Sequence, residues 1–328
     1  MTEINNMKYI ELQADDLRRL SAYYALRPNR SCDSSPLVSY LYKYYYMVKY
    51  CELDNALLMS YHGDEGSVYG FIPFCRESDL AHYFKLQERY FNNILKLPLN
   101  ITSADEEGVR KLLSSGALEN YEVIRADDLR DYLYDGNALR TLAGRKYSKK
   151  RNHINKFLSV YDGRWEYRSL SYENRDEVIR FLKKWMHDKL LNEQSTGVNE
   201  VGDTFDPVEE LNGEYRGICG LLNSPVVYGY MKIGGIYIDG TLQAFSIGVR
   251  SESESMAIID VEKANPDIDG LYQIINREFL VSEFPDVDLV NREDDIGIEG
   301  LRRSKLSYYP CGFENKYILR QKDPLCHS

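Results

Sequence analysis

The fold is decided by residues 227–263, which read VYGYMKIGGIYIDGTLQAFSIGVRSESESMAIIDVEK. Apolar periodicity predicts three strands here, the second of them bent by a turn: Val227–Lys232, Gly235–Ile238 continuing into Leu242–Val249, and Met256–Lys263. Asp239-Gly240 marks a hairpin, because an Asp-Gly pair suits the positive φ angles of a tight β-turn. Three antiparallel strands in succession are therefore expected at the centre of the second half of the chain.

Further helices and strands flank this centre on both sides. Before it we expect a strand, a helix and a second helix opened by Asp206 as N-cap, Pro207 in the first turn and Glu209 as capping-box acid: Trp165–Ser169, Glu173–Leu190, and residues 206–222. After it we expect a helix, a strand, a helix and a strand: Gly270–Phe284, Val287–Asn291, Gly297–Tyr309 and Lys316–Arg320.

The first half of the chain gives a less regular version of the same order. Its expected strands are Met7–Leu12, Met47–Cys51, Ala56–Tyr61, Val68–Phe74, Asn100–Thr102 and Tyr121–Ile124. Its expected helices are Asp15–Ala25, Ser35–Tyr44, Leu80–Leu95 and Glu106–Leu113, the last behind a Ser103/Glu106 capping box. In both halves the order resembles the fold of the Gcn5-type N-acetyltransferases (GNAT). We therefore expect an α/β (α+β) protein of tandem GNAT-like folds, with mixed, mostly antiparallel sheets flanked by helices.

The same reading divides the chain into three parts. Residues 1–135 are expected to form an N-terminal lobe, and residues 163–328 a C-terminal lobe that carries the active cleft. Residues 136–162 lie between them as a basic bridge. The bridge is expected to be one long helix, Asn137–Tyr161, that ends before Asp162-Gly163 and spans the two lobes.

Composition narrows the range of partners. The net charge is -10 and the isoelectric point about 5.2, which opposes nonspecific attraction to nucleic acid or to an anionic bilayer, and no DNA partner is expected. The six cysteines are scattered without a C-x-x-C pair, so no metal site is expected. No run approaches the length of apolar sequence that a membrane span needs, so we expect no integral membrane segment and a cytoplasmic location.

One lysine interrupts an apolar helix face. Lys305 falls on a stripe of the helix expected at Gly297–Tyr309, together with Ile298, Leu301 and Tyr308. Two interpretations stay open. Either the aliphatic part of Lys305 is buried while its ammonium reaches solvent or a carboxylate, or the ammonium faces a cleft and stabilises an anion or a developing oxyanion.

A carboxylate interrupts a second apolar face. Glu278 shares that face with Leu271, Ile274 and Ile275, where an ionised group is costly unless it is paired. A structural ion pair is slightly favoured there over a functional acid.

The bridging helix carries its charges on two faces. Arg151, with Asn155 beside it, lies on a stripe with Tyr147, Ile154 and Leu158 and is expected to point inward. The second face carries Lys146, Lys149, Lys150 and His153. A face of this kind is usually a basic patch exposed to solvent. The working hypothesis is that Arg151, Glu278 and Lys305 turn toward one shared polar hollow.

Two carboxylates are expected on one face of the third central strand. Strict alternation places Ala257, Ile259 and Val261 on one side and Ile258, Asp260 and Glu262 on the other. In the GNAT fold the fourth and fifth strands splay apart at this end to admit the acyl donor. Asp260 or Glu262 is therefore a candidate general base for deprotonating an amine. A polar segment flanks the same gap, and its residues alone favour a simple turn: Asn291, Arg292, Glu293 and Asp294.

The loop that would hold a coenzyme A pyrophosphate is missing. GNAT proteins carry a glycine-rich loop between the fourth strand and the next helix, whereas this chain reads ANPDIDG at residues 264–270. Only one glycine is present, together with two acids, so a pyrophosphate would be poorly received at this helix N-terminus.

Four stretches resemble one bacterial family: LAGRKYSKKRNHINKF at 142–157, IDVEKA at 259–264, GLYQIIN at 270–276 and VNREDDIGIEGLRRSKLSY at 290–308. That family is classed with the C-terminal catalytic domain of phosphatidylglycerol lysyltransferase. The likeness covers most of the chain and is specific after residue 131. It implies tandem acetyltransferase folds related to the Fem peptidyltransferases, which take an aminoacyl group from charged tRNA rather than from coenzyme A.

The resemblance also implies a set of functional positions, with Lys305 as an essential cation. The matching residues are Lys150, Arg151, Asn152, Asn155, Glu262, Tyr272, Asn276, Asn291, Arg292, Glu293, Arg302, Lys305 and Tyr308. Lipid-modifying relatives carry an N-terminal membrane domain that this sequence lacks, so phosphatidylglycerol is a doubtful acceptor and the acceptor stays unknown.

Three functions compete at this point. The leading hypothesis is an acyl- or aminoacyltransferase without a permanently bound cofactor, which uses acyl-coenzyme A or aminoacyl-tRNA as donor. In it Glu262 or Asp260 is the base, while Lys305 and Arg151 stabilise the oxyanion or the donor. The second is a noncatalytic module that binds a small anion, and the third is a tRNA-binding protein that uses Lys146, Lys149 and Lys150.

Overall fold

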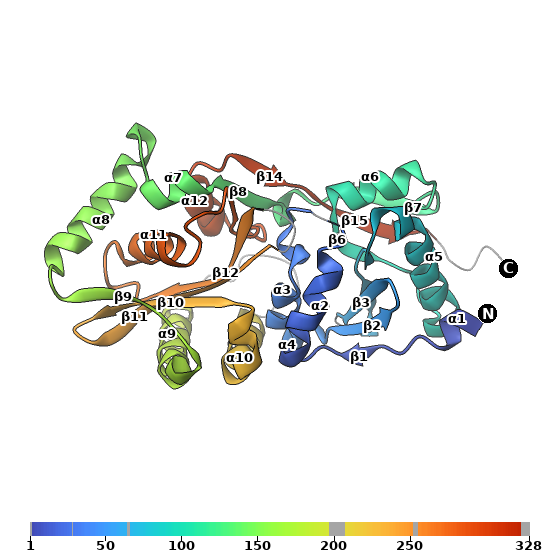
Figure 1. Ribbon diagram of the computed structural model, residues 1–328, viewed down its shortest axis with the longest axis horizontal. Coiled ribbons are helices and arrows are strands. Elements are labelled where there is room, and N and C mark those ends of the chain that lie inside the picture. The colour runs from blue at the N-terminus through green and yellow to red at the C-terminus, as the bar shows by residue number, and fades with distance from the viewer. Residues whose placement is uncertain (1, 28, 64–65, 197–206, 252–254, 323–328) are drawn as a thin grey trace.

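The computed structural model describes residues 2–27, 29–63, 66–196, 207–251 and 255–322 (Figure 1). Its N-terminal half contains six helices and seven strands among these residues. The helices are α1 Thr2–Asn5, α2 Leu17–Tyr24, α3 Pro36–Leu41, α4 Lys43–Tyr46, α5 Leu80–Tyr90 and α6 Glu106–Ser114. The strands are β1 Ile10–Glu11, β2 Lys49–Leu53, β3 Ala56–His62, β4 Val68–Gly70, β5 Phe74–Cys75, β6 Ile101–Asp105 and β7 Tyr121–Arg125.

The remaining elements build the other half of the molecule. The helices are α7 Gly136–Thr141, α8 Ser148–Val160, α9 Arg175–Thr196, α10 Pro207–Asn223, α11 Leu271–Glu283 and α12 Glu299–Leu306. The strands are β8 Asp131–Asp135, β9 Trp165–Ser169, β10 Lys232–Ile238, β11 Thr241–Arg250, β12 Met256–Ala264, β13 Leu289–Asn291, β14 Gly312–Glu314 and β15 Lys316–Gln321.

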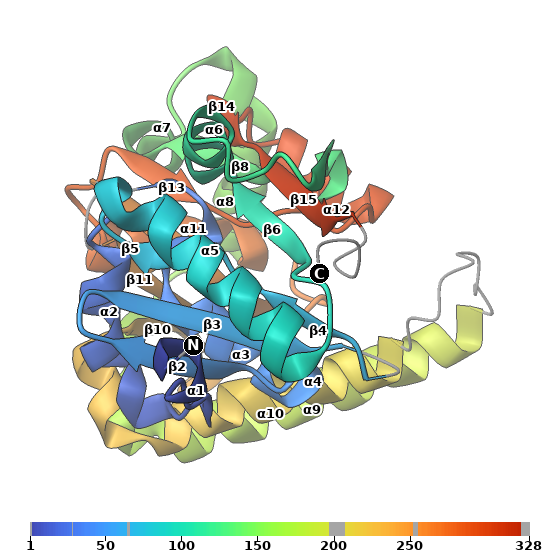
Figure 2. The same ribbon diagram turned by 90° about the vertical axis from the view of Figure 1, so that its right-hand side faces the viewer.

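A seven-stranded sheet in the order β14-β8-β13-β12-β11-β10-β9 forms the C-terminal lobe. Only the pair β12–β13 is parallel, and the other neighbours run antiparallel. Helices α9 and α10 cover one face of the sheet and run side by side (Figure 2), while α7, α8 and α11 lie over the other face (Figure 1). Both faces are therefore covered, as the near-continuous apolar sequence of β10 to β12 requires.

The two lobes exchange strands. The N-terminal lobe is built on a five-stranded sheet, β1 to β5, and on a three-stranded sheet in the order β6-β15-β7. Its central strand β15 is the segment Lys316–Arg320 that was expected in the C-terminal lobe, and this placement was wrong. Conversely, β8 precedes the expected boundary at residue 135 yet pairs with β13 and β14 in the seven-stranded sheet.

A glycine stripe brings the lobes into close contact. Helix α10 packs against α3 and α4 of the N-terminal lobe through Gly213, Gly217 and Gly220. A Cβ atom at position 217 would lie 2.1 Å from the backbone oxygen of Leu41, so only glycine fits at this helix crossing. One apolar core accordingly runs through both lobes, from Leu57 and Met59 to Phe245 and Ile258.

The bridge differs from the single helix that the sequence predicts. Helix α7 ends at Leu142, which adopts a left-handed conformation, and Gly144 follows with a φ of 90°. A short 3-10 turn, Arg145–Tyr147, then leads into α8. Both helices pack on α11, so they belong to the C-terminal lobe and do not span the two lobes.

Two local predictions in the central strands also need correction. Residues 225–229 form a 3-10 helix, so the strand expected at Val227–Lys232 begins only at Lys232. The hairpin at Asp239-Gly240 is confirmed, since Ile238 pairs with Thr241.

Asp206, the expected N-cap of α10, lies outside the described residues. On α6 the N-cap is Asp105, which accepts a bond from the Gly108 amide, and not Ser103.

Candidate functional site

Strands β12 and β13 separate at their carboxyl ends and form a fork. Their parallel pairing ends at Ile258 and Asn291. Beyond this point β12 continues through Asp260 and Glu262, whereas the chain after β13 turns away toward α12. The splayed strands expected from the sequence are therefore present, and the side chains that follow the last pair face a common interior.

Alternation along β12 is broken by a β-bulge. Ile247 pairs with Val261 and Gly248 with Ile259, so Asp260 is the extra residue. As a result Ile258 and Val261 both enter the core on the α9 side, while Ala257 and Ile259 face α11. The expected grouping was wrong for Ile258 and Val261, which were predicted on opposite faces, because the bulge shifts the alternation after Ile259.

The first charged group in the fork is an ion pair. Glu262 Oε1 lies 3.1 Å from Arg292 Nη2, and Glu262 Oε2 accepts a hydrogen bond of 3.0 Å from the Asn276 amide on α11. The Arg292 guanidinium also lies over the rings of Tyr134 and Tyr308. Burial acts to lower the pKa of Arg292, but Glu262, Tyr134 and Tyr308 together outweigh it and the pKa is raised, so the guanidinium stays charged.

Lys150 reaches the same group from α8. Its ammonium lies 3.8 Å from the centre of the Tyr308 ring and donates a hydrogen bond of 2.7 Å to the Ser307 hydroxyl. Burial and the nearby Arg292 lower the pKa of Lys150 to about 8. The sequence placed Lys150 on a solvated face, and this was wrong: it is the α8 cation closest to the fork.

Lys305 has a structural role in the turn that follows β13. Its ammonium donates hydrogen bonds to the backbone oxygens of Arg292 and Asp294, and so it fixes the turn that follows β13. Burial lowers the pKa of Lys305, against the opposing effect of Glu293. The stripe expected around it is only half buried, because Ile298 is 48% exposed and Leu301 is 43% exposed, whereas Tyr308 is buried.

Three buried carboxyl oxygens have no hydrogen-bond partner. They are both carboxyl oxygens of Asp260 and one carboxyl oxygen of Glu293, near the turn that Lys305 holds. Burial raises the pKa of Asp260 well above its ordinary value. Burial and the proximity of Asp260 also raise the pKa of Glu293, so both groups favour the neutral form.

A second buried network joins the fork to the N-terminal lobe. The ammonium of Lys316 on β15 lies 2.8 Å from Asp131 and 3.0 Å from Asp33. Asn291, at the base of the fork, donates hydrogen bonds to Asp131 and to the backbone oxygen of Arg30. These contacts lock the exchanged strand and the fork together.

Several expected site residues lie elsewhere. Arg151 caps the backbone oxygens of Leu142 and Gly144, and Asn152 and Asn155 are exposed. Arg302 pairs with Asp128 and Asp295 at the surface. Glu278 pairs with its neighbour Arg277, which agrees with the structural interpretation. Arg151, Glu278 and Lys305 therefore do not share one hollow, and that hypothesis was wrong.

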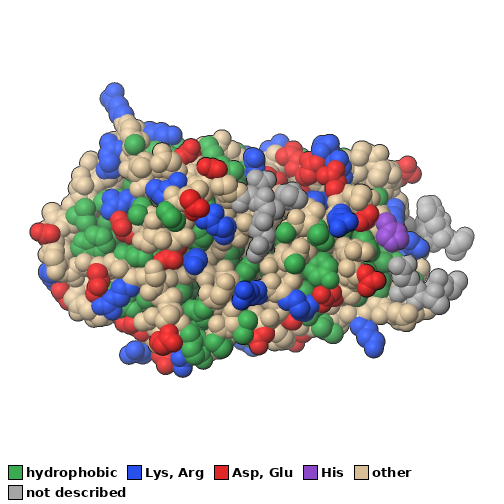
Figure 3. Space-filling view, in the orientation of Figure 1, with side chains coloured by type: hydrophobic (Ala, Val, Ile, Leu, Met, Phe, Trp, Pro, Cys, Tyr) green, Lys and Arg blue, Asp and Glu red, His purple; other side chains and the backbone are tan. Residues whose placement is uncertain are grey.

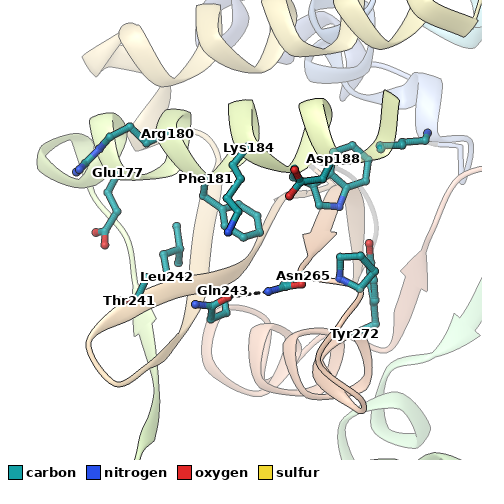
Figure 4. A pocket seen from close by; sticks show the side chains of 13 residues that line it. Glu177, Arg180, Phe181, Lys184, Asp188, Thr241, Leu242, Gln243, Asn265 and Tyr272 are labelled. Atoms are coloured by element: carbon teal, nitrogen blue, oxygen red, sulfur yellow. Dashed lines mark hydrogen bonds between the residues drawn. The ribbon is translucent and has the colours of Figure 1, made fainter. Parts of the chain in front are cut away.

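A cavity of about 610 Å³ lies on the opposite, α9-covered side of the sheet (Figure 4). Helix α9, the start of β11 and the loop after β12 line it, and Tyr272 is the one expected site residue at its rim. The other lining residues are Glu177, Arg180, Phe181, Lys184, Trp185, Asp188, Lys189, Thr241, Leu242, Gln243, Asn265 and Pro266. The sequence predicted the helix at Glu173–Leu190 but marked none of its residues as part of a site.

Comparisons with known proteins define the class. The structure superposes on a conserved protein of unknown function from Bacteroides thetaiotaomicron with a TM-score of 0.79 and 24% identity, covering 96% of this chain and 100% of that one. The structure of L-PGS from Bacillus licheniformis superposes with a TM-score of 0.64 and 13% identity, covering 95% of this chain and 93% of that one. FemX superposes with a TM-score of 0.57 and 8% identity, covering 95% of this chain and 97% of that one. The fold is thus that of a tandem GNAT-like acyltransferase, as expected.

The family follows from the sequence itself. Residues 24–320 match the family described as phosphatidylglycerol lysyltransferase, C-terminal. The chain belongs to this family, which confirms the resemblance seen in the four quoted stretches. A Mycoplasmoides gallisepticum protein described as uncharacterized is 26% identical over 194 residues, 58% of this chain and 56% of that protein. The aligned part thus spans little more than half the length of this curated relative.

Two features are absent from the described residues. None of their helices is both long and apolar enough to cross a bilayer. No three of their His, Cys, Asp and Glu side chains are grouped so that they could hold a metal ion.

Proposed function

We propose that this chain transfers an activated acyl or aminoacyl group to an amine or hydroxyl acceptor in the fork between β12 and β13. One observation carries the proposal: Glu262, Arg292 and Lys150 gather just beyond the last paired residues of the two strands. A carboxylate that can take a proton thus lies beside two cations that can stabilise negative charge. Family membership supports the same class of reaction.

The roles follow from the contacts. The acceptor nitrogen or oxygen attacks the carbonyl carbon of the donor, and its proton passes to Glu262. The new C–N or C–O bond forms while the bond to the donor's oxygen or sulfur breaks. The ammonium of Lys150 and the guanidinium of Arg292 stabilise the oxyanion. Lys305 is a positioning residue, since its donors hold the turn after β13, and Asp260 is the second choice of base because it is fully enclosed.

The start of α11 favours aminoacyl-tRNA over acyl-coenzyme A as donor. Asp269 there is engaged by His153 at 2.8 Å and by Lys156 at 2.7 Å. A Cβ atom on Gly270 would lie 2.4 Å from the backbone oxygen of His153, so α8 covers this helix end closely. A pyrophosphate at this place would meet carboxylates and the α8 backbone in place of open amide groups.

A basic surface near the fork supports the same donor. Arg145, Lys146 and Lys149 are exposed, and Figure 3 shows basic side chains over α7 and the start of α8. Lys149 lies beside Lys150 on α8, and Arg145 and Lys146 lie in the 3-10 turn that precedes it, so the end of an RNA bound there would reach the fork. This binding should weaken steeply with salt.

The test compares two glutamates in a transfer assay. Charged tRNA or acyl-coenzyme A is incubated with an amine acceptor, and loss of the donor ester or thioester is followed for wild type, Glu262→Gln and Glu278→Gln. Removal of the base should slow transfer about a hundredfold in Glu262→Gln. Glu278→Gln, which breaks an ion pair outside the fork, should transfer as wild type. Equal rates for Glu262→Gln and wild type would exclude the proposed base, and donor binding without turnover in wild type would favour the noncatalytic alternative.

A further inference from the structure

The cavity beneath α9 is separate from the fork. Consecutive β12 residues point to opposite sides of the sheet: Glu262 contacts Asn276 and Arg292, whereas Lys263 lies 4.5 Å from the Trp185 ring on α9. Neither Asn276 nor Arg292 lines the cavity. The cavity is therefore a second site, and the transfer chemistry proposed above does not use it.

Its lining is mostly apolar along its length. Phe181 and Trp185 come from α9, Leu242 from β11, Pro266 from the following loop and Tyr272 from α11. At about 610 Å³ the space is far larger than one water or ion requires and falls within the range of organic ligand sites. The walls therefore suit a ligand with an extended apolar body.

One cation enters this apolar space. Figure 4 shows the side chain of Lys184 descending from α9 toward the strand, between the helix and Gln243. Two acids also line the cavity: Glu177 already accepts a hydrogen bond of 2.7 Å from Tyr237, whereas Asp188 is 49% exposed and lies 3.5 Å from its neighbour His187. Arg180 and Lys189 also line the cavity, but Figure 4 shows Arg180 directed away from the strand, so Lys184 is placed to meet the head group of a ligand.

We infer that this cavity binds a single-chain amphipathic anion, with its chain along Phe181, Trp185 and Leu242 and its carboxylate or phosphate head on Lys184. Burial of the chain supplies the driving force, because apolar surface leaves water on both sides. The ammonium selects the head group, because an anion gains a charge-assisted hydrogen bond and a cation is repelled.

Tryptophan fluorescence tests this assignment directly. The chain has two tryptophans, and Trp165 packs on Phe157 away from the cavity. In the Trp165→Phe protein, Trp185 alone reports the site. Dodecanoate and dodecyl phosphate, each below its micelle concentration, should shift the emission of Trp185 saturably. The two probes distinguish a carboxylate head from a phosphate head by their relative affinities, and binding of either supports the proposal.

Matched variants make the test selective. Lys184→Gln should weaken binding of the anions about tenfold, because it removes a charge-assisted hydrogen bond. Lys183→Gln is the control: it removes the neighbouring exposed lysine of α9, which does not line the cavity. Dodecyltrimethylammonium should bind at least tenfold more weakly than dodecanoate. Equal affinity for the cation and the anion, or unchanged binding in Lys184→Gln, would overturn the assignment. Absence of any Trp185 response to both anions would overturn it as well.

Discussion

Arg292 and Glu262 form an ion pair, 3.1 Å between Nη2 and Oε1, across the point where β12 and β13 part. The two side chains are only 14% and 13% exposed, so each charge depends on the other for compensation. The pair therefore links the strand that carries the proposed base to the turn that carries the proposed cation.

Breaking this pair should be costly. Arg292→Leu leaves Glu262 buried with the Asn276 amide as its remaining partner, and the free energy of unfolding should fall by about 3 kcal/mol. Denaturant unfolding monitored by circular dichroism measures the change. Arg303→Leu is the control, because it breaks the exposed pair between Arg303 and Glu299 on α12, which should contribute almost nothing. A similar loss in both variants would contradict the assignment of the fork pair as buried.

The pH dependence of transfer should report on Lys150. Burial lowers the pKa of Lys150 to about 8, so its ammonium is lost as the pH rises through about 8. If this ammonium stabilises the oxyanion, the transfer rate should fall above pH 8 in wild type. Arginine keeps its charge in this range, so Lys150→Arg should show no such fall. Transfer rates from pH 6 to 10 test this, and an identical fall in the variant would assign the titration to another group.

Asp260 should make the protein less stable as the pH rises. Burial raises the folded-state pKa of Asp260 above the unfolded value of about 4, so its contribution is present below that pH and is lost above it. Asp260→Asn should therefore gain stability over wild type as the pH increases from 4 to 8. Unfolding curves at several pH values measure the difference.

Asp286 provides a control of opposite sign. Its pairing with Arg250 lowers the pKa of Asp286, so Asp286→Asn should be less stable than wild type near neutral pH. That difference should vanish as the pH falls through the folded pKa. The same trend in both variants would show that the Asp260 carboxyl is charged in the folded protein.

The glycine stripe of α10 should tolerate no side chain at position 217. Gly217→Ala places a methyl group against the Leu41 backbone oxygen and should cost about 2 to 3 kcal/mol of unfolding free energy. Gly300→Ala, in α12, meets no atom within 4 Å and should stabilise the protein by about 0.5 to 1 kcal/mol. Thermal unfolding of the two variants compares them. A neutral Gly217→Ala would mean that α10 and α3 can separate without penalty.

Element order and family could be predicted from the sequence because they depend on local periodicity and on contiguous motifs. The hairpin at Asp239-Gly240 and the strand Met256–Lys263 follow from residues close together in the chain, whereas the fork at the end of β12 was expected from the likeness to the GNAT fold. The candidate site was predicted in part: Glu262, Asn276, Arg292 and Tyr308 come together as the family motif implies.

The predictions that were wrong depend on three-dimensional geometry, which the local pattern of apolar and polar residues does not indicate. The bulge at Asp260 shifts the strand alternation by one residue, and nothing in the run of apolar residues marks it. The break at Leu142 and Gly144 rotates the next helix, so Lys150 faces the fork and Arg151 caps a loop. The exchange of β15 is a pairing between segments far apart in the chain. The residue pattern of β15 by itself fits the three-stranded sheet and the seven-stranded sheet equally well.

The exchanged strand sets the order in which the chain can be completed during translation. Strands β6 and β7 are finished by Arg125, but the strand that joins them begins only at Lys316. Until the ribosome has made that segment, the edges of β6 and β7 that pair with it have unpaired backbone groups, which are sites for pairing with a wrong strand. The N-terminal lobe, although synthesised first, is thus the last to close.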